Sequence, residues 1–147
     1  RSQNIMQECG DFVIKRRDGL FAYQLAVVVD DALQEVTEIV RGTDLLDSTP
    51  RQIYLQQLLN YTTPAYCHLP LSIDAAGNKN SKTEGAARVD LQHNVKLLFS
   101  ILEILGHQPP GDLLQSTVTD IWYWAQQNWN INHVSSKLHI HPVLNQQ

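Results

Sequence analysis

The sequence predicts an α/β fold over residues 1–85 and an α-helical part over residues 86–147. In the first part, short apolar runs typical of strands alternate with helical patterns. Residues 74–88 then change to a Gly-, Asn-, Ser- and Lys-rich composition, and the apolar residues that follow recur at helical spacing. With 147 residues, 43% of them hydrophobic, the chain can bury a core and is not a disordered tail.

The first elements follow from local patterns. Residues 11–16 alternate as a strand does, and Asp18-Gly19 predicts a turn after them. Residues 22–33 are ambiguous, because the triplet Val27–Val29 favours a strand while its neighbours fit one face of a helix. Residues 36–41 predict a short strand that ends at a loop.

The middle of the chain predicts a helix and then a second strand. Ser48-Thr49-Pro50 combines a hydroxyl N-cap with proline at the first helical position, and a helical pattern continues to Asn60. Residues 66–73 predict a buried strand, which Pro70 weakens or places at a sheet edge. Residues 74–88 predict a flexible loop.

Two helices are expected in the last part. Apolar residues between 91 and 105 have helical spacing and end at Gly106, and a further helix is expected over residues 113–127. The cluster Trp122-Tyr123-Trp124 could stack on bases. Because the last 51 residues hold one cation, Lys137, we expect these aromatic residues to pack in the core instead.

Charge and cysteine content exclude several classes of protein. The 11 basic and 15 acidic residues give a net charge of -4, which argues against a surface devoted to nucleic acid. Ten of the eleven basic residues lie at or before Lys96, so an anion site is expected in the first two thirds. Cys9 and Cys67 fit no zinc motif, and we expect no metal site. No apolar run approaches the ~20 residues that cross a bilayer, which predicts a soluble intracellular protein.

The lysines of the loop are the first candidates for chemistry. Lys79 and Lys82, with Ser81 between them, provide ammonium groups and backbone amides that could balance a triphosphate during displacement of pyrophosphate. The alternative is an ordinary lysine-rich surface loop.

Arg41 and Tyr23 are the next candidates. Arg41 follows an apolar strand and could form a two-pronged bond to a carboxylate, or a structural ion pair with a nearby acid. Tyr23 could donate a hydrogen bond to a ligand, although a buried tyrosine satisfied by the backbone is commoner. His68, in an apolar stretch, is more typical of a core histidine.

Taken in order, these segments resemble the glutamyl class I aminoacyl-tRNA synthetases. The stretches that carry the resemblance are residues 18–31, 36–46 and 48–52, then His68-Leu69-Pro70-Leu71 and the KMSKS-like Lys79-Asn80-Ser81-Lys82. The ending, from Ile104 to Pro110 with Trp124-Ala125 and Trp129, is similar to that of the glutamyl-Q tRNA(Asp) synthetases.

The resemblance implies a fold and an activity. Residues 1–85 would be the C-terminal half of a Rossmann-like nucleotide-binding core with the KMSKS-like loop, and residues 86–147 a helical subdomain. Residues 22–33 would then be helical. The protein would be a cytoplasmic ligase that activates glutamate with ATP and Mg and attaches it to the queuosine base of tRNA(Asp).

The resemblance also assigns roles to individual residues. Lys82 and Lys79 would be catalytic, and Tyr23 and Arg41 would hold the glutamate. ATP would contact Lys82, Ser81, Lys79, His68 and Leu69. Asn80 departs from the family, because a hydrophobic residue usually occupies that motif position.

Part of the family's machinery is missing from this sequence. The HIGH-type motif and the cysteine zinc site of the first half are absent, so we expect an incomplete enzyme that is inactive alone. Arg1 in place of an initiator methionine agrees with a fragment. We expect the chain to require the missing half or to self-associate. The alternatives are a non-catalytic remnant that binds nucleotide, RNA or a protein, and a fragment of glutamyl-tRNA synthetase, which the short ending disfavours.

Overall fold

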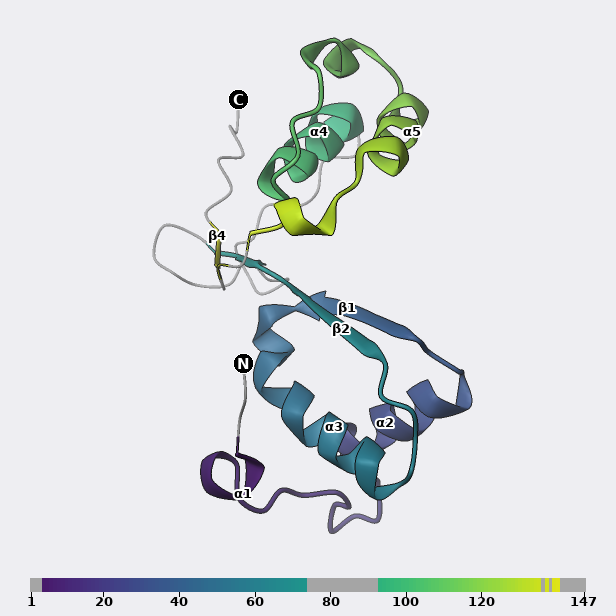
Figure 1. Ribbon diagram of the computed structural model, residues 1–147, viewed down its shortest axis with the longest axis vertical. Helices are drawn as coiled ribbons and strands as arrows, with labels where there is room; N and C mark the ends of the chain where they lie inside the picture. Colours follow the sequence, from purple (N-terminus) through teal and green to yellow (C-terminus); the bar gives the residue numbers. More distant parts are fainter. Residues whose placement is uncertain (1–3, 74–92, 136, 138, 141–147) are drawn as a thin grey trace. The chain divides into compact units, whose positions relative to one another are not determined.

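The computed structural model describes residues 4–73, 93–135, 137 and 139–140 (Figure 1). The chain divides into two compact units, Arg1–His68 and Leu69–Gln147, which are considered separately. The boundary predicted between residues 85 and 86 lies outside the described residues and stays a prediction.

The first unit combines helices with a small sheet. Its elements in order are α1 (Ile5–Glu8), α2 (Tyr23–Leu33), β1 (Glu38–Gly42), the 3-10 helix η1 (Thr43–Ser48), α3 (Thr49–Leu58) and β2 (Ala65–Leu69). Strands β1 and β2 form a two-stranded sheet, and helices α2 and α3 contact each other (Figure 1). The predicted strand at residues 36–41 is confirmed, with a start two residues later.

Helix α2 resolves the ambiguity of the valine-rich segment in favour of the helix that the resemblance implied. Val28 is only 1% exposed on it, and Leu55 of the neighbouring α3 is also buried. The helical propensity of valine is lower than that of alanine by less than about 1 kcal/mol. Burying one such side chain contributes about 1.5–3 kcal/mol, so tertiary packing outweighs the local preference.

Helix α3 begins where the sequence predicts, although its first hydroxyl does not cap it. Ser48 occupies the N-cap position with Pro50 in the first turn, but the Ser48 side chain makes no capping bond. Its Oγ instead accepts a hydrogen bond from Gln24 Nε2 at 3.0 Å. Gln24 Oε1 in turn accepts a hydrogen bond from Gln52 Nε2 at 2.9 Å, so side-chain hydrogen bonds join α2 to α3.

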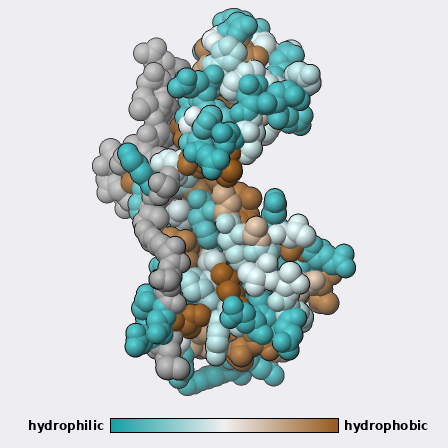
Figure 2. Space-filling view, in the orientation of Figure 1, coloured by the Kyte–Doolittle hydropathy of each residue, from teal (hydrophilic) through white to brown (hydrophobic). Residues whose placement is uncertain are grey.

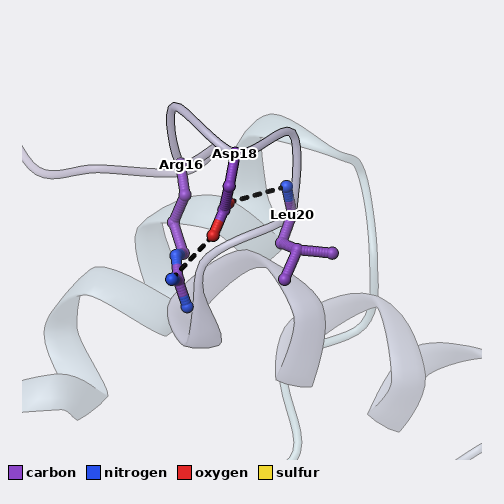
Figure 3. A network of polar contacts seen from close by, with 3 residues as sticks. All are labelled: Arg16, Asp18 and Leu20. Carbon is purple, nitrogen blue, oxygen red and sulfur yellow. Dashed lines mark hydrogen bonds and ion pairs between the residues drawn. The ribbon is translucent and has the colours of Figure 1, made fainter.

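The predicted strand at residues 11–16 is wrong. The segment contributes one isolated antiparallel bridge, Lys15 with Phe21, and the side chains of Val13 and Ile14 are exposed. The turn at Asp18-Gly19 is confirmed: Asp18 Oδ1 accepts from Leu20 N at 3.2 Å, and its other carboxylate oxygen pairs with Arg16 at 2.7 Å (Figure 3). A single bridge gives too few hydrogen bonds to extend a strand from this turn.

The second predicted strand is interrupted where its proline lies. β2 ends at Leu69, and a separate two-residue strand, β3 (Leu71–Ser72), pairs in parallel with β4 (His139–Ile140). Pro70 lacks the N–H that would continue a ladder. The side chains of Tyr66 to Ile73 are half-buried, whereas the sequence predicted full burial.

The second unit is built on two helices. Its helical elements are α4 (Asn94–Ile104), the 3-10 helix η3 (Gly111–Gln115), α5 (Val118–Asn128) and the 3-10 helix η4 (Ile131–His133). Phe99 and Leu102 of α4 pack with Ile121 and Ala125 of α5 to form the core. Helix α5 begins five residues later than predicted, because Thr117 and Asp120 form a capping box there.

The aromatic residues of α5 do not all pack as expected. Trp124 packs against the core cluster, but Trp122 is 54% exposed and Tyr123 is also exposed. Trp129, just after the helix, stacks on the buried His107 ring with a centroid separation of 4.5 Å. The packing prediction therefore holds for Trp124 and fails for Trp122 and Tyr123.

The surface carries apolar side chains in several places (brown in Figure 2). In the first unit, the exposed ones include Val13, Leu20, Phe21, Leu33 and Val40. Among the residues that the structure describes, no helix has the length and apolar character needed to span a bilayer.

Gly106 is expected to be intolerant of a side chain. Its φ is +84°, and a Cβ at this position would collide with the backbone carbonyl of His133. We expect Gly106→Ala to lower the free energy of unfolding of the second unit by about 2 kcal/mol or more. All three tryptophans lie in this unit, so urea unfolding followed by tryptophan fluorescence measures the change.

Gly111 provides the matched control for this substitution. A Cβ there would meet nothing within 4 Å, so Gly111→Ala is expected to change the free energy of unfolding by less than about 0.5 kcal/mol. Equal losses in the two variants would contradict the collision at Gly106.

Candidate functional site

The candidate site is centred on the Arg41 guanidinium, which β1 presents beside the start of α3 and strand β2. Arg41 Nη2 donates a hydrogen bond to Thr49 Oγ1 at 2.5 Å, and Arg41 Nε donates to His68 Nε2 at 3.4 Å. The guanidinium carbon also lies 5.1 Å from the centre of the Tyr66 ring, a cation–π distance. Three residues from two elements, α3 and β2, therefore contact this cation.

The surroundings of Arg41 bear on the two roles predicted for it, which are binding a ligand carboxylate and forming a structural ion pair. The contacts above are all with neutral groups, and the ion pair that the structure shows among the described residues joins Arg16 to Asp18 instead. The structural ion pair expected as an alternative for Arg41 thus has no support in the described part of the chain. A half-buried cation without a bound carboxylate is suited to an anionic ligand.

His68 acts as a hydrogen-bond acceptor in this arrangement. Its Nε2 accepts from Arg41, which can only donate, and lies 2.8 Å from Thr49 Oγ1. Nε2 must therefore be unprotonated, and the neutral ring carries its proton on Nδ1. Burial, and then the charge of Arg41, lower the pKa of His68, which agrees with a neutral imidazole.

This arrangement predicts a pH dependence of stability. Since the pKa of His68 is lower in the folded chain, the unfolded chain binds more protons below its pKa of about 6.5. The contribution of His68 is therefore complete above pH 6.5 and is lost as the pH falls through the folded pKa. We expect His68→Gln, which keeps an acceptor but cannot titrate, to lose less stability than the original chain between pH 7.5 and pH 5. Urea unfolding at both pH values, followed by circular dichroism, measures this difference, and equal losses would contradict the assignment.

Tyr66 contacts both the cation and His68. Its ring stacks on His68 with a centroid separation of 6.3 Å, and its hydroxyl accepts a hydrogen bond from the buried Gln56 at 3.0 Å. Burial raises the pKa of Tyr66, while the Gln56 bond and the charge of Arg41 oppose the rise. The phenol therefore stays neutral at physiological pH.

The structure describes some of the residues predicted to contact a ligand and not others. Tyr23 begins α2 and is 52% exposed, so it is free of the buried role that was its alternative. Of the two residues predicted to hold the glutamate, Arg41 contacts the Tyr66 ring, and the hydrogen bonds and ring contacts described for this site do not include Tyr23. His68 and Leu69 both belong to β2. Lys79, Ser81 and Lys82 lie outside the described residues.

The sequence interpretation missed Thr49, Tyr66 and Gln56. Thr49 was read as part of a helix cap, although its hydroxyl serves the site instead. Tyr66 could have been found, because residues two apart on a strand share a face and Tyr66 precedes His68 by two. Gln56 is polar but 2% exposed, and no local pattern indicates that burial.

The described residues offer no cluster of three or more His, Cys, Asp or Glu side chains that could hold a metal ion. Cys9 and Cys67 are both free thiols.

Comparison with known proteins identifies the family. Residues 2–145 match the family of class I tRNA synthetases (E and Q), catalytic domain. The chain belongs to this family. The class I synthetase segment is 49% identical over 142 residues to the glutamyl-Q tRNA(Asp) synthetase of Thiobacillus denitrificans, a match that covers 97% of the chain and 46% of that relative. The relative of the same name from Aromatoleum aromaticum is 49% identical over 138 residues, or 94% of the chain and 44% of the relative.

Solved structures agree on the fold of the class I synthetase segment. It superposes on a glutamate tRNA ligase from Elizabethkingia meningosepticum with a TM-score of 0.58 and 18% identity, over 84% of this chain and 28% of that one. The predicted fold class, part of a class I synthetase catalytic domain, is thereby confirmed. The chain spans slightly less than half the length of the curated relatives reported above.

Proposed function

We propose that this chain is the C-terminal part of a ligase that activates glutamate with ATP and transfers it to the queuosine base of tRNA(Asp). The observation that carries the proposal is the near-complete match of the chain to relatives named glutamyl-Q tRNA(Asp) synthetase. The reaction would take place in the cytoplasm.

The geometry around Arg41 supports a substrate that carries a carboxylate. The hydrogen bonds described for Arg41 use Nε and one N–H of Nη2. A guanidinium has five N–H donors, so three donors on the Nη1 and Nη2 end are not engaged by these bonds. That end can form two parallel hydrogen bonds to one carboxylate. Tyr23, which is exposed at the start of α2, has a hydroxyl that would donate to the same ligand.

The ATP side of the site is proposed from the sequence motifs. Strand β2 would line the adenine through the backbone of His68 and Leu69, and Lys79, Ser81 and Lys82 would contact the phosphates. In the activation step the glutamate carboxylate attacks the α-phosphorus, pyrophosphate leaves, and negative charge shifts onto the leaving oxygens. Lysine ammonium groups, with Mg, would stabilise this charge.

Two assays on the longer protein that carries this chain test the proposal. Glutamate-dependent exchange of pyrophosphate into ATP reports activation, and attachment of labelled glutamate to tRNA(Asp) with and without queuosine reports transfer. We expect exchange with glutamate and transfer that requires queuosine. Transfer to tRNA(Glu) would instead indicate a fragment of glutamyl-tRNA synthetase. Nucleotide or RNA binding without exchange would indicate a non-catalytic remnant.

A further inference from the structure

We propose that Thr49 is the residue that positions the Arg41 guanidinium for the substrate carboxylate; this inference rests on the proposed function. Thr49 Oγ1 accepts from Arg41 Nη2 at 2.5 Å and lies 2.8 Å from His68 Nε2. Thr49 therefore hydrogen-bonds to the cation and also contacts its second acceptor, His68.

The direction of each hydrogen bond follows from the chemistry of the three groups. Arg41 can only donate, so Thr49 Oγ1 and His68 Nε2 both accept from it. The single proton of the Thr49 hydroxyl is then free to point to His68 Nε2 at 2.8 Å or to the Leu45 carbonyl at 3.4 Å. The shorter distance favours His68, whose single Nε2 lone pair is then shared by the Thr49 and Arg41 donors, and this shared acceptor closes a ring through Arg41, Thr49 and His68.

This ring fixes the guanidinium in a single orientation. Nε and Nη2 lie at two corners of the planar group, so anchoring both prevents rotation about the terminal bonds of the side chain. The edge that carries Nη1 is then directed away from both acceptors. Without the Thr49 hydroxyl, the guanidinium keeps only the longer 3.4 Å bond to His68 and its contact with the Tyr66 ring.

The proposed anchor is a buried side chain on a regular helix. Thr49 is 8% exposed in the first turn of α3, where proline follows it. Gln52, one turn further along, is buried and bonded to Gln24 of α2. A group that must hold a ligand contact to within about 0.5 Å is best supported by a buried side chain on a regular element. Thr49 meets this condition, whereas the exposed Tyr23 does not.

The experiment compares Thr49→Val with Thr49→Ser in the longer enzyme. Valine keeps the shape of threonine but removes the hydroxyl, and serine keeps the hydroxyl. We expect Thr49→Val to raise the KM for glutamate about tenfold in ATP–pyrophosphate exchange, with the KM for ATP unchanged. Thr49→Ser should restore the KM for glutamate to within about threefold of the original value. Thr62→Val, at an exposed position, is the matched control and should change neither KM.

A second measurement separates this proposal from the proposed function. In the longer protein that carries this chain, the Arg41 Nε–H proton, whose resonance is assigned through its loss in Arg41→Lys, should exchange slowly with solvent protons. This proton should exchange with solvent faster in Thr49→Val than in the unmodified protein, and at an unchanged rate in Thr49→Ser. Absence of glutamate-dependent ATP–pyrophosphate exchange in the unmodified enzyme would refute the proposed function, whatever the Arg41 resonance shows. An unchanged glutamate KM or an unchanged resonance in Thr49→Val would overturn the positioning role.

Discussion

Arg41→Ala is expected to raise the KM for glutamate roughly 10²-fold in ATP–pyrophosphate exchange, while the KM for ATP remains unchanged. Removing the half-buried Arg41 costs about 2–5 kcal/mol of binding, because the substrate carboxylate then loses its charged partner and its hydrogen bonds. The loss falls on glutamate alone, since the proposed ATP contacts do not include Arg41.

The folded structure should survive this substitution. When Arg41 is removed, the Thr49 hydroxyl can still bond to His68 at 2.8 Å, and the Tyr66 hydroxyl keeps its bond from Gln56. No carboxylate that contacts Arg41 in the described part of the chain would be left unpaired. We therefore expect the circular dichroism spectrum and the unfolding midpoint to change little.

Two further substitutions make this experiment specific. Arg41→Lys keeps the charge but loses the planar fork, so it should recover only part of the affinity for glutamate. Arg16→Ala removes an exposed arginine whose ion pair with Asp18 contributes at most about 1 kcal/mol, and it should leave both KM values unchanged. Unfolding of Arg41→Ala, with a normal glutamate KM for the folded fraction, would indicate a structural role instead.

Several elements were predictable because the local and the tertiary requirements agree. The strand at residues 36–41, the helix start at Pro50 and the end of α4 near Gly106 all carry local signals that the fold uses. Val27–Val29 is different, because its local preference for a strand opposes the packing of α2 on α3. For this segment the local pattern did not distinguish a strand from a helix, and the family resemblance correctly implied the helix.

The failures have a common physical origin. Residues 11–16 alternate as a strand does, but a strand also needs a partner, which the sequence of one segment does not specify. The hydroxyls of Ser48 and Thr49 fit a helix cap equally well, yet they bond to Gln24, Arg41 and His68, which are distant in sequence. The sequence therefore indicated Arg41 as a candidate site residue, but it did not indicate the groups that contact it.

Lys82→Ala is expected to lower kcat for ATP–pyrophosphate exchange roughly 10²–10³-fold, equivalent to about 2.7–4 kcal/mol. The reason is that charge develops on the phosphate oxygens as pyrophosphate leaves, and an ammonium group aimed at that charge acts most strongly in the transition state. Glutamate does not contact Lys82 in this proposal, so its KM should change much less than kcat. The prediction rests on the Lys79-Asn80-Ser81-Lys82 motif, which lies outside the described residues.

The control distinguishes a specific contact from a loss of general positive charge. Lys96 is an exposed lysine on α4, and Lys96→Ala removes the same charge from a position without a proposed ligand. A surface charge acts on ATP only through a screened field, so this variant should retain kcat to within about twofold at 0.15 M salt. A field effect would weaken with added salt in both variants, whereas the loss from Lys82→Ala should persist. An unaltered exchange rate in Lys82→Ala would refute its catalytic role and leave the motif as an ordinary lysine-rich segment.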